Sequence, residues 1–131
     1  MRFETRRLPS AHDVIAPDGS EVRILLALGR GSMAHFALAS GQTSAAVRHR
    51  SVEELWYVLS GQGEMWRRTD DPQEAIVVLE PGVSVSIPPG TRFQFRATGT
   101  DPLCAVGVTM PPWPGADEAE IVAGPWQPTV R

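Results

Sequence analysis

The chain has 131 residues, 42% of them hydrophobic and 21% charged, with a formal net charge of -3. This length suits one folded domain, and twelve scattered Lys and Arg against fifteen Asp and Glu leave no basic surface for nucleic acid. No apolar run approaches the ~18 residues of a membrane span, the first residues lack the apolar core of a signal peptide, and the single Cys104 has no disulfide partner, so we expect a cytoplasmic protein with no membrane partner.

Nine short runs rich in Val, Ile, Leu, Phe and Trp follow one another along the chain, separated by turns rich in Gly and Pro. We expect strands near Val22–Leu28, Met33–Ala39, Ala45–Arg50, Leu55–Leu59, Glu64–Arg68, Ala75–Leu79, Val83–Ile87, Phe93–Ala97 and Leu103–Thr109. Strands this short cannot each bury a face alone. The pattern therefore predicts an all-β protein in which two antiparallel sheets close on one another as a sandwich or barrel.

The two ends of the chain differ in composition from this core. We expect one domain over residues 1–131, with a barrel core at about 22–110, an N-terminal arm at 1–21 and a Pro- and Trp-rich tail at 111–131. The prolines prevent the tail from forming a regular central strand. Two exposed indoles would be costly, so the tail should lie extended against the barrel with its two tryptophans packed.

Two stretches carry a spaced pattern of turn and polar residues. The first places Gly41, His49, Glu54 and Gly61 in order, and the second runs from Gly82 to Phe93 with each of its turn residues in place. Together they resemble the paired motifs of the cupin superfamily. The resemblance covers most of the chain and implies an antiparallel double-stranded β-helix, that is, a jelly-roll barrel of the RmlC-like type.

The resemblance also implies a metal position, because the family motifs supply His, His and Glu from the first stretch and a third His from the second. Here Val47 stands in place of the first histidine and Phe93 in place of the last, while Ala97 replaces the usual Asn. His49 and Glu54 remain, but a catalytic zinc or a non-haem iron usually takes three protein ligands. We therefore expect no metal and no other cofactor, with weak binding of a divalent metal at His49 and Glu54 left open.

Strand alternation predicts which side chains share the barrel interior. Val47 and His49 fall on one face, and Trp56, Phe93 and Phe95 also have inward parity, which predicts an aromatic ligand-binding pocket with one His and one Glu. The side chains of four arginines should point outward: Arg48, Arg50, Arg92 and Arg96. His49 and Glu54 are either a structural pair joined by a hydrogen bond or a general acid and base, and the sequence leaves both interpretations open.

Other polar residues are poorer candidates for the pocket. Glu53 should face away from Glu54, His35 should lie opposite the core face that Phe36 marks, and His12 should be on the surface of the N-terminal arm. Cys104 shares its parity with neighbouring valines and is expected in the core rather than as a thiolate ligand.

These residues predict a protein that binds a small organic molecule in its barrel. If it is an enzyme, His49 and Glu54 favour metal-independent proton transfer, as in an isomerase, cyclase or lyase. One alternative is a metal-dependent, dioxygenase-like enzyme that completes the two residues with a non-standard ligand such as Cys104. A second alternative is a non-enzymatic binding or interaction module. Apolar residues on both faces of Leu55–Leu59 predict a homodimer.

Overall fold

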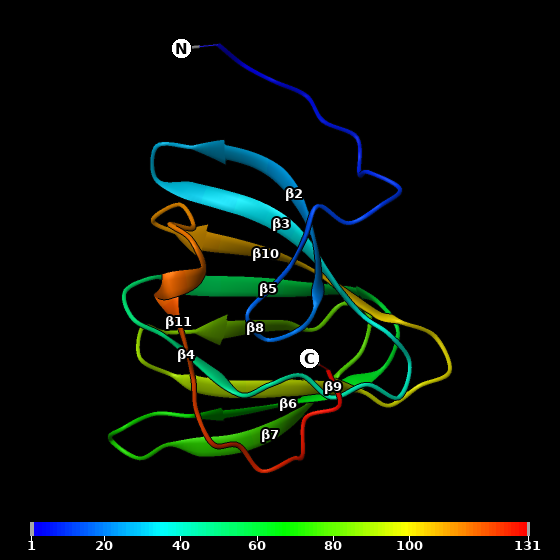
Figure 1. The fold of residues 1–131 in the computed structure, drawn as a ribbon, viewed down its shortest axis with the longest axis vertical. Coiled ribbons are helices and arrows are strands. Elements are labelled where there is room, and N and C mark those ends of the chain that lie inside the picture. The colour runs from blue at the N-terminus through cyan, green and yellow to red at the C-terminus, as the bar shows by residue number, and fades with distance from the viewer. Residues whose placement is uncertain (1, 131) are drawn as a thin grey trace.

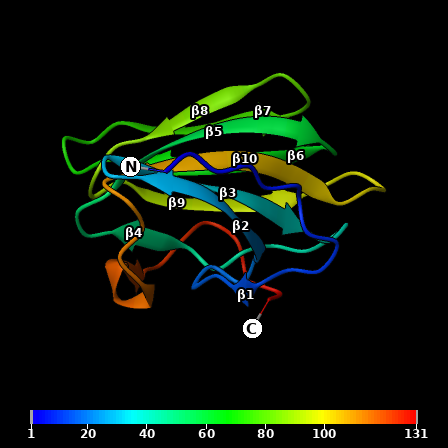
Figure 2. The same cartoon turned by 90° about the horizontal axis from the view of Figure 1, so that it is seen from above.

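The computed structural model describes residues 2–130 and consists of two antiparallel sheets that face each other (Figures 1 and 2). One sheet has the order β1-β2-β3-β10-β5-β8 and the other β11-β4-β9-β6-β7. Within the described residues, the helical part is the short 3-10 turn η1, and no helix is long and apolar enough to cross a membrane. The elements are β1 (Val14–Ile15), β2 (Glu21–Leu28), β3 (Gly31–Leu38), β4 (Val47–His49), β5 (Glu53–Ser60), β6 (Gly63–Arg68), β7 (Glu74–Leu79), β8 (Ser84–Ile87), β9 (Arg92–Ala97), β10 (Leu103–Met110), η1 (Ala116–Glu118) and β11 (Ala119–Ile121).

Alternating side chains determine which face of each strand is buried. In β5, Glu54, Trp56 and Val58 are buried, while the residues between them are exposed. Strands β8 and β10 alternate in the same way. Because successive side chains point to opposite faces of a strand, the sheets enclose one set and leave the other outside. The predicted all-β antiparallel barrel is confirmed.

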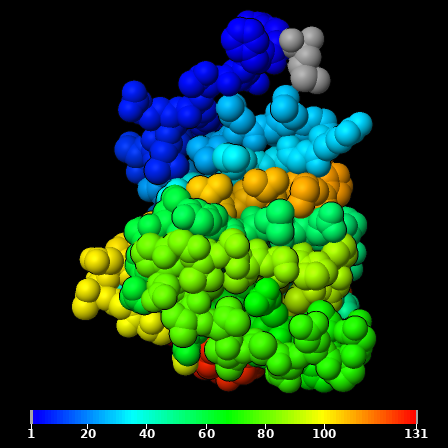
Figure 3. All heavy atoms as spheres, turned by 180° about the vertical axis from the view of Figure 1, so that it is seen from behind, coloured from blue at the N-terminus to red at the C-terminus, as the bar shows by residue number. Residues whose placement is uncertain are grey.

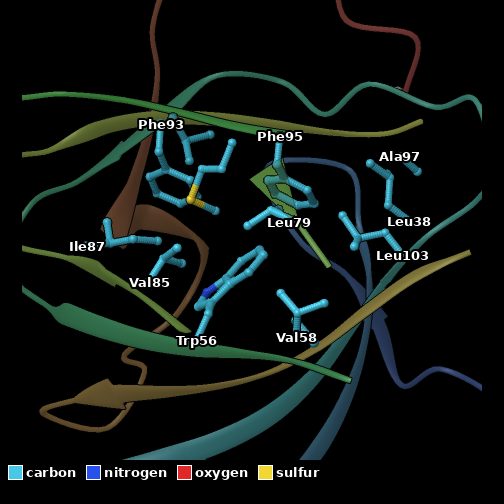
Figure 4. Close-up of a cluster of buried hydrophobic side chains, with 13 residues drawn as sticks. Leu38, Trp56, Val58, Leu79, Val85, Ile87, Phe93, Phe95, Ala97 and Leu103 are labelled. Carbon is cyan, nitrogen blue, oxygen red and sulfur yellow. The ribbon is translucent and has the colours of Figure 1, made fainter. Parts of the chain in front are cut away.

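The core lies where the inner faces of the two sheets meet. Phe93 and Phe95 from β9 point toward Trp56 from β5, and Leu79 and Val58 fill the space beside them (Figure 4). All five side chains are almost completely excluded from solvent. Burying such side chains contributes roughly 1.5–3 kcal/mol each, so this cluster is a main source of stability.

All nine predicted strands are present, and the differences lie at short segments. Strand β4 covers 47–49 rather than 45–50, because the Ala45 amide donates a hydrogen bond to the carbonyl of Asp18 instead of to a neighbouring strand. Strands β1 and β11 were not predicted. With two and three residues, they are too short to show an alternating pattern.

The two ends of the chain lie on different parts of the barrel. The N-terminal arm projects from the body and is mostly exposed (Figures 1 and 3), and the Arg23 guanidinium tethers it by donating to the carbonyls of Pro9 and Ser10, both at 2.9 Å. The tail crosses the outer face of the five-stranded sheet, where the buried Gln94 amide donates to the Trp126 carbonyl at 2.9 Å. The Trp126 ring lies under the guanidinium of Arg96, so this indole is packed as expected.

Candidate functional site

A cavity of about 630 Å³ opens between the two sheets. Its inner part includes five side chains from three strands: Val47 and His49 from β4, Glu54 and Trp56 from β5, and Phe93 from β9. The pairing register explains why they meet, because Val47 lies directly opposite Phe93 across the β4–β9 pair. The structure thus brings five of the six sequence-predicted site residues to one cavity.

Phe95, the sixth, does not line the cavity. It is 1% exposed and packs edge-on against Trp56, with ring centroids 4.9 Å apart. Phe93 and Phe95 share a parity, but two residues along a strand separate them by about 6.6 Å, so Phe95 lies beyond the inner end of the cavity. It supports the wall that Trp56 forms and does not reach the cavity itself.

Glu54 is a buried carboxyl in largely apolar surroundings. Its Oε2 accepts a hydrogen bond of 2.8 Å from the Trp56 Nε1–H, and its side chain is 3% exposed. Burial raises the pKa of Glu54 from 4.5 to about 8, against the lowering effect of the Trp56 hydrogen bond and with a further rise from the charge of Asp18. At neutral pH, Glu54 is therefore a neutral acid that can donate a proton.

His49 is neutral for the same reason. Burial lowers its pKa from 6.5 to about 4, with a smaller opposing effect from the Glu118 carboxylate. Its ring contacts the rings of Phe93 and Trp113 edge-on, at centroid distances of 5.2 and 5.1 Å. Trp113, the other indole of the tail, is therefore packed against the barrel as well.

His49 and Glu54 are in contact but form no hydrogen bond. His49 Nδ1 lies 3.5 Å from Glu54 Oε1, and within residues 2–130 this buried nitrogen has no hydrogen-bond partner. The hydrogen bond that the structural interpretation of the pair assumes is therefore not formed in this geometry. A neutral base and a neutral acid thus face the same cavity, where each could exchange a proton with a molecule bound between them.

Asp18 is a second cavity carboxyl that the sequence analysis missed. It lies in the loop between β1 and β2, is 7% exposed, and its Oδ1 accepts hydrogen bonds from the Ser20 amide at 2.9 Å and the Ser20 hydroxyl at 2.7 Å. Burial raises its pKa, although both Ser20 bonds lower it. The Pro17-Asp18-Gly19 sequence indicated only a turn, and nothing in it shows that this turn folds over a cavity.

The outer part of the cavity comes from the chain ends. Val14 and Ile15 of β1 contribute from one side, and the segment 112–119 contributes Trp113 from the other. The Trp113 amide donates to the Ser32 hydroxyl at 2.9 Å, and the Glu118 carboxylate holds this segment in place. That carboxylate accepts bonds from the Ser51 hydroxyl and from the amides of Ser51 and Val52.

Gly107 keeps the cavity open beside the acid. A Cβ atom at this position would lie 2.9 Å from Glu54 Oε2 and 2.5 Å from the Phe36 ring. We expect Gly107→Ala to displace these side chains and to destabilise the protein by about 1–3 kcal/mol, the usual cost of overpacking. Urea unfolding measures it. Gly29→Ala is the control because a Cβ there meets nothing within 4 Å; equal unfolding midpoints of the two variants would contradict the expectation.

The residues in the cavity do not fit a metal centre. Val47 and Phe93 occupy the positions of two family ligands and offer only carbon, so one imidazole, His49, and one carboxyl, Glu54, remain at the family positions. Within residues 2–130, no group of three or more His, Cys, Asp or Glu side chains is arranged to hold a metal ion. A catalytic zinc or iron site needs at least three such donors, so we derive no step through a metal.

The remaining candidates lie outside the cavity. Glu53 is exposed, and His12 is near Glu21 on the surface. His35 is buried beside Arg23, on the face of β3 opposite to Phe36.

The expectation of a core position for Cys104 is wrong. It is half-buried on the outer face of β10, because the inner face of that strand belongs to the alternate residues that begin with Leu103. The four arginines of outward parity are at least partly exposed, and all four form ion pairs at the surface: Arg48 and Arg50 with Glu120, Arg92 with Asp70 and Arg96 with Glu64.

Comparisons with known proteins agree with this architecture. Residues 34–109 match the family model described as Cupin domain, and no curated protein matches the chain. The capsular polysaccharide assembling protein CapF from Staphylococcus aureus superposes with a TM-score of 0.70 at 16% identity, over 83% of this chain and 33% of CapF. CapF has also been solved with the inhibitor 3-isopropenyl-tropolone.

Two further solved structures have the same fold. A conserved protein from Klebsiella pneumoniae with a double-stranded β-helix domain gives a TM-score of 0.65 at 17% identity, over 83% of this chain and 89% of that one. Oxalate decarboxylase from Bacillus subtilis, which has Mn(II) centres, gives 0.69 at 17% identity over 82% and 29%. This chain spans about a third of CapF and of the decarboxylase, and identities this low show a shared fold alone.

Proposed function

Because this chain belongs to the cupin family, we propose that its barrel binds a small organic molecule and that His49 and Glu54 move protons on it without a metal. One observation carries the proposal. A cavity of about 630 Å³ brings a neutral imidazole and a neutral carboxylic acid to the same apolar space. This volume lies within the ~300–1,000 Å³ of typical ligand sites.

The chemistry follows from the two protonation states at neutral pH. The imidazole of His49 can accept a proton from an activated carbon of the ligand, while the Glu54 carboxyl donates its own proton to an oxygen of the ligand. The Trp56 Nε1–H holds Glu54 Oε2, which leaves Oε1 toward His49. His49 then returns the proton to Glu54, whose Oε1 lies 3.5 Å from His49 Nδ1, and both side chains regain their original protonation states. This sequence suits an isomerase, a cyclase or a lyase.

Deuterium exchange tests the proton transfer without knowledge of the substrate. We expect the protein to speed exchange at the α-carbon of phenylacetone in D₂O, and His49→Gln or Glu54→Gln to lower the rate by about 10²- to 10⁴-fold, the usual worth of a positioned acid or base. Glu53→Gln, one residue away on the exposed face of β5, is the control. NMR measures the exchange. Equal rates in all four proteins would remove the catalytic role and leave binding.

The two alternatives are less well supported. A metal-dependent enzyme would need a third donor, and Cys104 lies on the outer face of β10, away from the cavity. An interaction module with a filled barrel is disfavoured by the volume of the cavity. CapF, which shares the fold, binds a small tropolone inhibitor.

We also propose a homodimer through the outer face of the six-stranded sheet. Leu55, Tyr57 and Met33 are 52%, 51% and 41% exposed there, and the tail lies against the other sheet. The view from behind shows this face with no chain end across its middle (Figure 3). Leaving so many apolar side chains in water is costly, and a second copy would cover them.

We expect the protein to sediment as a dimer and Tyr57→Glu to make it a monomer, because a charge at the centre of an apolar interface costs several kcal/mol. The control is Ile76→Glu, which changes an equally exposed residue on β7 of the other sheet. Analytical ultracentrifugation gives the mass. A wild-type monomer at high concentration, or a dimer lost equally in the control variant, would contradict the proposed interface.

A further inference from the structure

We infer that the cavity selects organic cations, in particular an ammonium group carried on an apolar body about the size of an aromatic ring. This inference rests on the proposed binding function, since it names the ligand class of the same cavity. Its basis is the combination of two unpaired carboxyls with aromatic walls.

Apart from His49, the titratable groups that line the cavity are carboxyls. Within residues 2–130, the lining contains Asp18 and Glu54 but neither Lys nor Arg. Asp18 is 7% exposed and Glu54 is 3% exposed, and in the described chain neither is in contact with an ammonium or guanidinium group. Buried carboxyls are normally paired with a cation, because a single buried charge is costly. In this cavity the protein provides no such cation, so burial keeps Glu54 protonated, and an ammonium group bound beside it would favour its ionised form.

The hydrogen bonds leave acceptor oxygens turned to the cavity. Both bonds from Ser20 reach Oδ1 of Asp18, and Oδ2 has no hydrogen-bond partner among residues 2–130. For Glu54, Trp56 occupies Oε2, while Oε1 has only the 3.5 Å contact with His49. An N–H donor that enters the cavity would find an oxygen without a partner on each side. Asp18 comes from the β1–β2 loop and Glu54 from β5, so a ligand between them would bridge the loop and the sheet.

The walls provide the second component of cation recognition. Phe36 and Trp56 are stacked with ring centroids 5.2 Å apart, and Phe93 and Trp113 complete an aromatic lining. The face of an aromatic ring carries a partial negative charge that attracts a cation and repels an anion. Apolar side chains such as Val47 and Ile15 would surround the hydrocarbon part of the ligand. Carboxyls and ring faces together therefore favour a positive charge over a neutral or negative group of the same size.

Three probes that share one ring test the inference: benzylammonium, benzyl alcohol and benzoate. Trp56 and Trp113 line the cavity, so quenching of tryptophan fluorescence reports occupancy, and calorimetry gives the affinity. We expect benzylammonium to bind at least about tenfold more tightly than benzyl alcohol, and benzoate to bind most weakly. Benzyl alcohol or benzoate binding as tightly as the amine would overturn the cation preference but leave small-molecule binding intact. Binding of none of the three would overturn both proposals.

Variants then locate the preference. Glu54→Gln keeps an acceptor for the Trp56 indole and should reduce benzylammonium affinity about tenfold, with benzyl alcohol affinity unchanged. Asp18→Asn should act in the same direction, and circular dichroism confirms that each variant is folded. Glu53→Gln makes the same substitution on the exposed face of β5 and should change neither affinity. An undiminished preference for the amine in folded Glu54→Gln would overturn the assignment of the site.

Discussion

Replacing Glu54 by Gln should stabilise the protein by several kcal/mol at pH 8 and change its stability little at pH 4. The pKa of Glu54 is about 8 in the folded protein and about 4.5 in the unfolded chain. Between these two pH values the unfolded chain has released the proton of this carboxyl, whereas the folded protein keeps it. The protonated carboxyl therefore contributes its full stability below about pH 4.5, and this contribution is lost as the pH rises to 8. At 1.36 kcal/mol per unit of pKa difference, the loss is on the order of 5 kcal/mol.

Glutamine is a neutral side chain of the same shape and still accepts the hydrogen bond from Trp56. The free energy of unfolding of the variant should therefore not fall between pH 4.5 and 8 as that of the wild type does. Urea unfolding at pH 4, 6 and 8 measures the free energy of unfolding, and Glu53→Gln at the exposed position is the control. A difference between Glu54→Gln and wild type that is the same at all three pH values would show that Glu54 is ionised in the folded protein.

The second large effect is the creation of a metal site by the double substitution Val47→His with Phe93→His. These two residues are directly opposite across β4 and β9, and both line the cavity with His49 and Glu54. Two added imidazoles would raise the donors to three nitrogens and one carboxylate. The pKa of about 4 for His49 means that its imidazole is already neutral, as a ligand must be. We expect one equivalent of zinc to bind with a Kd below about 1 μM, or about 8 kcal/mol.

The wild-type protein should hold far less than one equivalent of any transition metal, and each single variant should bind more weakly than the double variant. Elemental analysis and calorimetry with zinc measure both. The triple variant with His49→Gln is the matched control, because it removes one donor from the completed set. A double variant that is folded by circular dichroism and yet binds no zinc would show that the two new side chains do not point toward His49.

Most of the fold could be predicted because its strands alternate cleanly. In β5, the sequence Glu53-Glu54-Leu55-Trp56-Tyr57 contains two apolar faces, and only the motif spacing to Gly61 indicates which carboxyl is inside. For Cys104 no motif gives that information. Alternation divides the residues of β10 into two sets but does not show which set faces the core. Cys104 was expected in the inward set and lies in the outward one.

The candidate site could be predicted only where it lies on regular strands. His49, Glu54 and Phe93 follow from parity and spacing, since strand geometry fixes where such residues point. Asp18 and Trp113 lie on irregular segments, whose course is set by contacts with distant parts of the chain such as Ala45 and Ser32. The sequence also does not show how far along a strand the cavity extends. Phe95 has the same parity as Phe93, but it packs against Trp56 beyond the end of the cavity.

The walls of the cavity come from two different parts of the chain. The segment that matches the family, residues 34–109, provides the acid, the base and the inner aromatic wall, whereas Asp18, Ile15 and Trp113 lie outside it. None of these three outer residues belongs to the buried core cluster of the two sheets. If the proposed function holds, ligand preference can diverge by exchange of the chain ends while His49 and Glu54 stay fixed, so related barrels could acquire different ligands without repacking their interiors.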